Sequence, residues 1–263
     1  MIDSHTHSEF SADSRMPLDD LIRTAISLGL QYLAVTDHLD RDFLFCDSKD
    51  IPQIDLAPYA AAMSAAKMKY GKKIKLAFGV ECGYSKDSEK MCFDELALYE
   101  TDVVINSVHT VENRDVYVES YYDGKTKDEI FIPYINAIGE SLEIETPYDI
   151  VGHIGYIARK APFPFRYADY DGLFDGIFKR MIQKGKCLEI NSHVKFAKAD
   201  FFPGKDLVKR YKELGGELLT FSSDAHQTYR IADKYGLIAE TAKSLGFKYY
   251  ACYTKHKPEM FLI

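Results

Sequence analysis

The sequence lacks any long hydrophobic run, because nowhere do eighteen or more apolar residues follow one another. A membrane-spanning helix needs about 20 such residues. The first residues, MIDSHTH, also lack the basic segment and the apolar stretch of a secretory signal peptide. We therefore expect a cytoplasmic protein without a membrane partner.

An excess of positive charge is also absent, because 33 Lys and Arg stand against 40 Asp and Glu and give a net charge of −7. Binding along a nucleic-acid backbone normally requires a basic face, so nucleic acid is not expected as a partner. No glycine-rich phosphate loop or dinucleotide fingerprint stands between a strand and a helix, so ATP and NAD are not indicated. The five cysteines are widely spaced, which predicts buried free thiols in a reducing compartment and not a disulfide framework.

Apolar runs of strand length alternate with amphipathic segments along the whole chain, as is typical of βα units around a parallel sheet. No linker, low-complexity tract or repeat beyond this βα period divides the chain, so we predict a single α/β domain over residues 1–263. The predicted strands, most of which end in polar residues, are Met1–His5, Tyr32–His38, Lys75–Glu81, Asp102–His109, Asp149–His153, Cys187–Asn191 and Glu217–Ser223.

An eighth apolar run, Lys248–Tyr253, is followed by Lys255 and His256, and we place His256 on the surface, outside any site. The segment from Pro17 to Leu28 predicts a helix that ends at Gly29. Later helices are expected to close at C′ glycines, namely Gly71, Gly185, Gly215 and Gly246. A stripe of three side chains predicts the core face of a helix: Tyr59, Met63 and Met68.

Seven of the eight histidines stand at or just past the C-terminal end of a predicted strand. Loops at these strand ends build the sites of (β/α) barrels. His5 and His7 lie two residues apart, so strand alternation places both rings on one face, within reach of one cation. Carboxylates such as Glu81 and Asp224 close other strands. Burying so many ionisable groups together is costly unless metal ions or partners satisfy them.

The candidate ligands outnumber the three or four that one zinc ion takes from a protein, so two or three ions are implied. Imidazole and carboxylate ligands without thiolates suit Zn, Fe, Mn or Co. A central carboxylate, either Glu81 or Asp224, can bridge two ions. A hydroxide held between the ions would act as the nucleophile, because the metals lower the pKa of bound water toward neutrality.

Seven segments carry a family resemblance: HTHSEFSAD, VTDH, FGVECG, NSVH, VGHIGYIARK, EINSH and SSDAH. In this order they resemble the polymerase and histidinol phosphatase (PHP) family, specifically its free-standing histidinol-phosphate phosphatases, over essentially the whole chain. The resemblance implies a distorted (β/α)7 barrel with a trinuclear metal site. It also implies hydrolysis of L-histidinol phosphate to L-histidinol and phosphate, a step of histidine biosynthesis.

The same resemblance implies three sets of ligands for divalent ions, which would be Zn, Fe or Mn. One ion would take His5, His7, Glu81 and Asp224. The second would take Glu81, His109 and His153, and the third Asp13, His38 and His226. Asp13 stands where many relatives have histidine, and its alternative role is a turn or cap before the helix near Pro17.

Phosphate recognition needs fixed positive charge, which the planar fork of an arginine supplies best. Arg159 stands where the phosphatase relatives carry a phosphate-binding arginine, and Arg166 is a weaker candidate. After the sixth strand the relatives carry a small-residue loop and an arginine, whereas this chain has His193, Lys195 and Lys198. We predict that Lys195 or Lys198 replaces that charge and that His193 lines the pocket or supplies a proton.

The loop after His109, residues 110–127, is rich in tyrosines and acidic residues. Side chains such as Asp115 and Tyr117 could hold the ammonium and imidazole groups of an amino alcohol phosphate. Solvated loop residues are the other interpretation. The general acid stays open between His226, His193 and a metal-bound water.

Three other functions compete with this hypothesis. A PHP-type phosphoesterase could act on a phosphotyrosyl protein or a nucleotide instead. An amidohydrolase shares a first-strand H-x-H, but it usually has a bridging lysine at the fourth strand, where this chain has His109. A non-catalytic metal or phosphate-binding module would have lost ligands, whereas the set here is complete. The sequence leaves the oligomeric state and the metal identity open.

Overall fold

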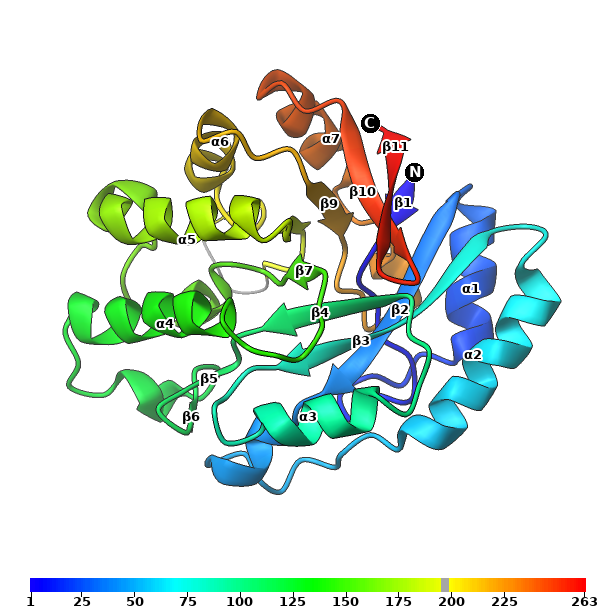
Figure 1. Cartoon of the computed structure of the whole chain (residues 1–263), viewed down its shortest axis with the longest axis horizontal. Coiled ribbons are helices and arrows are strands. Elements are labelled where there is room, and N and C mark those ends of the chain that lie inside the picture. Colours follow the sequence, from blue (N-terminus) through cyan, green and yellow to red (C-terminus); the bar gives the residue numbers. More distant parts are fainter. Residues whose placement is uncertain (195–198) are drawn as a thin grey trace.

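The computed structural model describes residues 1–194 and 199–263, and its main sheet contains seven parallel strands in the order β1-β2-β3-β4-β7-β8-β9 (Figure 1). The strands are β1 (Ile2–Asp3), β2 (Tyr32–Leu39), β3 (Lys75–Gly83), β4 (Val103–Ser107), β7 (Ile150–Val151), β8 (Cys187–Asn191) and β9 (Leu219–Ser222). The two outer strands meet just past their ends, where the His7 N–H donates to the Ala225 carbonyl at 3.0 Å. The sheet is therefore a nearly closed barrel, which confirms the predicted fold class.

Helices surround this barrel in Figure 1 and connect its strands. They are α1 (Leu18–Ser27), α2 (Leu56–Tyr70), α3 (Glu89–Leu96), α4 (Lys127–Ser141), α5 (Asp171–Gln183), α6 (Lys205–Glu213) and α7 (Tyr235–Ser244). Short 3-10 helices are η1 (Arg41–Phe45), η2 (Glu119–Tyr122), η3 (Tyr156–Arg159), η4 (Tyr167–Asp169) and η5 (Thr228–Arg230). Helix α1 buries Leu21, Ile22 and Ala25, as the sequence predicts. Gly29 follows it with a φ of +76°, a conformation that favours glycine.

Two predictions about α2 are wrong. Gly71 closes this helix in the right-handed region, with φ −60°, so the turn does not require a glycine there. Met68 is 82% exposed, whereas Tyr59 and Met63 are fully buried. Met68 lies nine residues after Tyr59, which at 100° per residue is the opposite side of the helix. Ala66 and Tyr70 continue the buried face instead.

The eighth apolar run does not enter the barrel. It forms β10 (Tyr249–Thr254), which pairs antiparallel with β11 (Lys257–Leu262). Lys255 and His256 make the tight turn between them, both with positive φ. The turn lies against the residues that precede β4 and β7, because His256 Nδ1 is 2.9 Å from Asp149 Oδ2. His256 thus contacts the end of the barrel opposite the predicted site, and its side chain is 38% exposed.

The chain after His109 is more ordered than a solvated loop. Thr110–Val111 (β5) and Arg114–Asp115 (β6) form a small antiparallel hairpin. Thr126 and Glu129 then form a capping box at the start of α4. This hairpin brings the buried side chain of Asp115 to the same end of the barrel as the strand-end histidines.

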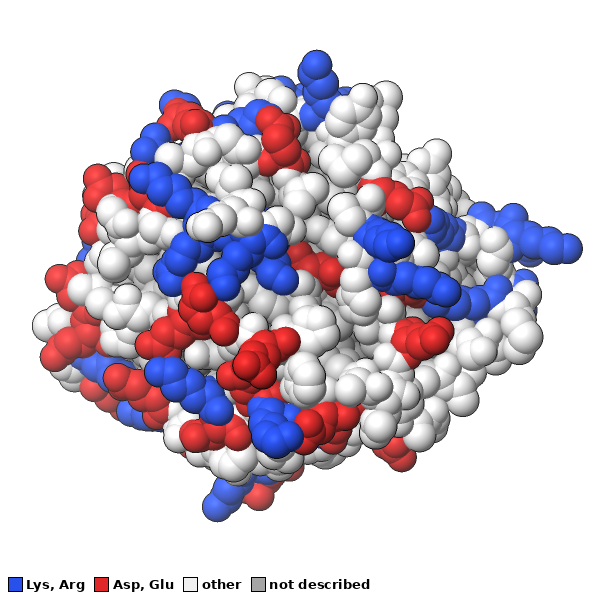
Figure 2. Space-filling view, viewed as in Figure 1, with Lys and Arg blue, Asp and Glu red and all other residues white. Residues whose placement is uncertain are grey.

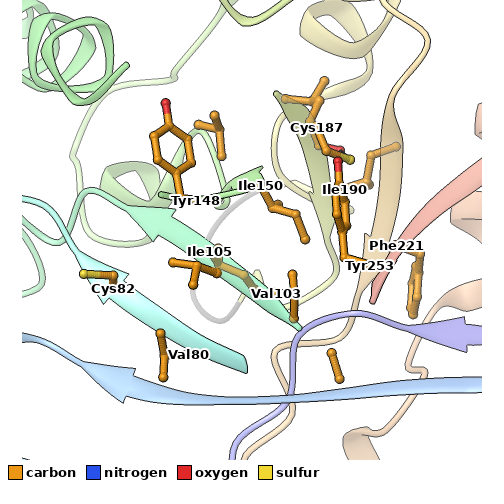
Figure 3. Close-up of a cluster of buried hydrophobic side chains, with 14 of the residues drawn as sticks. Val80, Cys82, Val103, Ile105, Tyr148, Ile150, Cys187, Ile190, Phe221 and Tyr253 are labelled. Carbon is orange, nitrogen blue, oxygen red and sulfur yellow. Dashed lines mark hydrogen bonds between the residues drawn. The ribbon is translucent and has the colours of Figure 1, made fainter. Parts of the chain in front are cut away.

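The hydrophobic core is continuous around the strands. Figure 3 shows buried side chains of neighbouring strands lying side by side, among them Val80, Ile105, Ile150, Ile190 and Phe221. All five cysteines are buried and free, as predicted: Cys46, Cys82, Cys92, Cys187 and Cys252. On the face shown in Figure 2, Lys and Arg lie interspersed with Asp and Glu. Among the described residues no helix is long and apolar enough to cross a membrane.

Candidate metal centre and its cavity

A cavity of about 820 Å³ opens at the C-terminal ends of the barrel strands. The predicted site residues that line it are Asp13, His38, Glu81, His109, Tyr117, His153, Arg159, His193, Asp224 and His226. His5 and His7 are completely buried next to these residues. The sequence therefore predicted a cluster that the fold does assemble.

Glu81, near the end of β3, lies at the centre of the cluster and is fully buried. Its Oε2 atom is 3.2 Å from His5 Nε2 and 3.6 Å from His7 Nε2. His7 Nε2 is also 3.2 Å from Asp224 Oδ1. These four residues are the predicted first ligand set, and their ligand atoms face one another.

Hydrogen bonds to the Nδ1 atoms of His5 and His7 indicate which nitrogen of each ring carries the proton. Ser11 donates its only hydroxyl proton to Asp37 Oδ1 at 2.6 Å, so its oxygen accepts from His7 Nδ1 at 3.1 Å. His5 Nδ1 donates to Glu189 Oε1 at 2.6 Å. If both rings were neutral, their Nε2 atoms would present lone pairs to each other at only 3.0 Å, which a proton or a metal ion must relieve. A cation between them would turn this repulsion into ligation.

The second predicted set gathers around the other oxygen of the same carboxylate. Glu81 Oε1 is 2.7 Å from His153 Nε2 and 3.2 Å from His109 Nε2. Ser107 donates to this oxygen at 2.7 Å. On its far side, His109 Nδ1 lies 3.0 Å from Asp40 Oδ1. The Asp40 contact leaves His109 Nε2 directed at Glu81.

The third predicted set lies nearer to the cavity mouth. Asp13 Oδ2 is 3.0 Å from His226 Nε2 and 3.7 Å from His38 Nε2. The ring of His7 stacks on both His38 and His226, with centroids 4.2 Å apart in each case. Asp13 is 58% exposed on its side chain and contacts both rings, which favours the ligand over the helix cap. Pro17, and not Asp13, is the residue that precedes α1.

The charges of this cluster shift several pKa values. Burial alone would raise the pKa of Glu81, but His5, His109 and His38 lower it well below its usual value. Burial alone would lower the pKa of His5, but Glu81, Glu189 and Asp224 raise it well above the usual range. Positive charge at the centre of the cluster thus stabilises the ionised carboxylates, and metal ions would supply it more fully than protons.

The donor set fits divalent metal ions. Glu81 Oε2, His226 Nε2 and His193 Nδ1 are buried atoms that find no hydrogen-bond partner within the described part of the chain. The potential ligand atoms are imidazole nitrogens and carboxylate oxygens, which lie within 4.8 Å of one another in groups of three. No thiol belongs to these groups. Buried ligand atoms that lie close to opposite charges without forming a hydrogen bond are expected where a cation completes the site.

Arg159, in η3, brings fixed positive charge to this centre. Its side chain is 7% exposed, and one terminal nitrogen donates to Asp224 Oδ2 at 2.9 Å. Its guanidinium carbon lies 4.6 Å from the ring centroid of Tyr156. Arg159 lines the cavity and only one of its terminal nitrogens donates to Asp224, so the fork has donors left for an anion there.

The other predicted substrate-binding residues differ in position. Tyr117 lines the cavity, and its ring centroid lies 6.0 Å from that of Tyr156. Arg166 is exposed and is not among the residues that line the cavity, so its position gives the prediction no support. Lys195 and Lys198 lie outside the described residues.

The chain matches the model of the PHP domain family over residues 3–193. It belongs to this family. The predicted family is thereby confirmed, and the amidohydrolase alternative is set aside.

Relatives within the PHP family agree over most of the chain. A Lactococcus lactis protein named histidinol-phosphatase is 31% identical over 86% of this chain and 84% of its own length. The crystal structure of histidinol phosphate phosphatase from Lactococcus lactis in complex with zinc, L-histidinol and phosphate superposes with a TM-score of 0.87 at 26% identity, covering 98% of both chains. A Listeria monocytogenes structure at 20% identity, with a TM-score of 0.79 over 90% of this chain and 99% of that one, shares the fold.

Sequence reasoning missed two carboxylates of this PHP site. Asp40 lies between two rings, with Oδ2 3.0 Å from His38 Nδ1 and Oδ1 3.0 Å from His109 Nδ1. Glu189 lies behind His5. Each had a signal: Asp40 follows the His38 strand end by two residues, and Glu189 is a charge inside an otherwise apolar strand.

Proposed function

We propose that this protein hydrolyses L-histidinol phosphate to L-histidinol and inorganic phosphate with the help of divalent metal ions. The observation that carries the proposal is the buried carboxylate of Glu81 among strand-end histidines, with Arg159 beside it in one cavity. The Lactococcus matches support the substrate, because the curated protein bears this activity as its name and the crystal structure holds L-histidinol and phosphate with zinc.

The residues that would hold the metals are the three predicted sets. One ion would take His5, His7, Glu81 and Asp224, a second Glu81, His109 and His153, and a third Asp13, His38 and His226. When bound, Zn, Mn or Fe ions supply a hydroxide nucleophile at neutral pH and polarise the phosphoryl oxygens.

The chain's own side chains orient the substrate. Arg159 would bind phosphate oxygens through the part of its guanidinium that faces the cavity, while Asp224 and Tyr156 hold the group in place. Tyr117 and Asp115 would face the other end of the substrate, which carries an ammonium and an imidazole group. His193 would hold a proton for the leaving oxygen, since it lines the cavity and its Nδ1 is 3.5 Å from Asp224 Oδ2. His226 is the competing donor.

The direct test measures phosphate release from L-histidinol phosphate, a phosphotyrosine peptide and a generic aryl phosphate with protein reconstituted in Zn, Mn or Fe. We expect kcat/KM to favour histidinol phosphate strongly. Comparable slow turnover of all three would keep the phosphoesterase class and overturn the substrate. Absence of turnover in a protein that retains its metals would favour the non-catalytic module.

A Glu81→Ala variant tests the central carboxylate. This variant removes the carboxylate that the first two predicted ligand sets share, so we expect loss of bound metal and of nearly all activity. Near-normal turnover at full metal content would refute the bridging role of Glu81. Glu145→Gln, on an exposed residue away from the cavity, is a control for handling and reconstitution.

A further inference from the structure

Glu189 is a completely buried acid inside the barrel that none of the predicted ligand sets uses. It lies in the middle of β8, between the buried apolar residues Leu188 and Ile190. Its Oε1 atom accepts from His5 Nδ1 at 2.6 Å, and its Oε2 atom accepts from the backbone N–H of His153. Burying a carboxylate costs free energy, and these two hydrogen bonds compensate part of that cost.

The hydrogen bond to Glu189 fixes which nitrogen of the His5 ring can bind a metal ion. Because His5 Nδ1 donates its proton to Glu189, Nε2 is the ring nitrogen left to bind a cation, and it lies 3.2 Å from Glu81 Oε2. A ring freed from Glu189 could place its proton on Nε2 or rotate, and either change would remove the ligand. Hydrogen-bonded carboxylates behind a histidine are the usual means of fixing a metal ligand.

The second contact joins two of the predicted ligand sets. His5 follows β1 and His153 follows β7, two strands that are not neighbours in the sheet. One carboxylate holds the ring of the first residue and the backbone of the second. Glu189 thus links His5 to His153 from behind the cluster, and their ring centroids lie 5.9 Å apart.

We propose that Glu189 is a positioning residue of the metal centre, which holds His5 as an Nε2 ligand and sets its place relative to His153. This inference rests on the metal centre of the proposed function and not on the identity of the substrate.

The test is the Zn²⁺ affinity of Glu189→Gln, measured by competition with a chromophoric chelator. Glutamine has nearly the same shape, but its amide offers one acceptor and one donor. Either orientation therefore sets an N–H against one of the two N–H groups that Glu189 accepts from. We expect the most weakly bound Zn²⁺ to be released about 10- to 100-fold more readily than in the unsubstituted protein.

The matched control is Asp149→Asn, another buried carboxylate that accepts a backbone N–H, here from Val104 at 2.9 Å. Asp149 precedes β7 at the opposite end of the barrel and contacts none of the predicted ligands. It should lower stability while leaving the Zn²⁺ affinity within about twofold. Equal losses of affinity in both variants, or none in the folded Glu189→Gln protein, would overturn the inference.

Nitrogen-15 NMR of the histidine rings provides a measurement that does not depend on a variant. We expect His5 of the metal-loaded, unsubstituted protein to carry its proton on Nδ1. If Glu189→Gln does not fold, this result decides, and a proton on Nε2 would refute the positioning role. Failure of the unsubstituted protein to bind Zn²⁺ would instead overturn the metal centre of the proposed function.

Discussion

Replacing Asp115 by asparagine should reduce the preference of the protein for a substrate that carries an amine. Asp115 is 7% exposed and lines the cavity. Its two oxygens accept from the Tyr117 N–H at 2.7 Å and from the Ser48 hydroxyl at 2.6 Å. It forms no ion pair with a described Lys, Arg or His, so its charge is available to a cationic group of the substrate.

The expected magnitude follows from the loss of one charge-assisted hydrogen bond in a buried position. Such a bond contributes about 1.5 to 3 kcal/mol, which corresponds to a loss of roughly 10- to 150-fold in kcat/KM. Asparagine keeps the shape of Asp115. Its oxygen can still accept from the Tyr117 N–H and its amide can donate to the Ser48 hydroxyl, whose proton can rotate away, so both segments should remain in place.

The assay compares L-histidinol phosphate with the same phosphate ester lacking the amine, for the unsubstituted protein and for Asp115→Asn. The loss should fall on the amine-bearing substrate and largely spare the other. Asp87→Asn is the control. Asp87 is exposed and does not line the cavity, but it accepts a hydrogen bond from Asn113, which lies in the same hairpin as Asp115. Equal losses on both substrates would show that Asp115 shapes the loop and does not bind the amine.

Three further perturbations have defined outcomes. Asp149 raises the pKa of His256 by a hydrogen bond at 2.9 Å, so the pair stabilises the fold below about pH 6.5 and loses this effect as pH rises through the raised pKa. His256→Gln should thus cost about 0.5 kcal/mol in urea unfolding at pH 6 and almost nothing at pH 9. Gly152→Ala would place a Cβ 2.1 Å from Ser107 Oγ, so Tm and metal content should both fall, whereas an unchanged metal content would contradict this. Arg159→Lys should lower kcat/KM about 10- to 100-fold and weaken inhibition by phosphate, because lysine lacks the planar fork.

Much of the fold could be predicted from the sequence, because apolar runs of strand length and segments with the amphipathic spacing of helices are both clear. Apolar strand runs that end in polar residues, followed by amphipathic helices, identified the seven barrel strands. The prediction for Met68 is wrong because this residue is five positions after Met63 and nine after Tyr59, a spacing that leaves the buried face of the helix. Side-chain spacing of three, four and seven residues would have selected Ala66 and left Met68 outside.

The ligand cluster was predictable because parallel strands place their C-terminal ends at one edge, whichever order they take. Asp40 and Glu189 were not predicted, because their roles depend on which strands are adjacent and on the direction of the histidine rings. Sequence spacing contains neither. A single charged residue at an inward position of an apolar strand is nevertheless a usable signal, and Glu189 is such a residue.

The register of the sheet explains why Glu81 can serve two ligand sets. His38 is its register partner on β2, and Ser107, which donates to Oε1, stands two residues past its partner on β4. Its two oxygens therefore point to different neighbours, one toward His5 and His38 and the other toward His153. Because these contacts come from rigid strand ends, the carboxylate has little freedom to move away from the charges around it. Positive charge beside this buried carboxylate, whether from the histidine rings or from bound metal ions, therefore stabilises the strand ends as well as serving the chemistry.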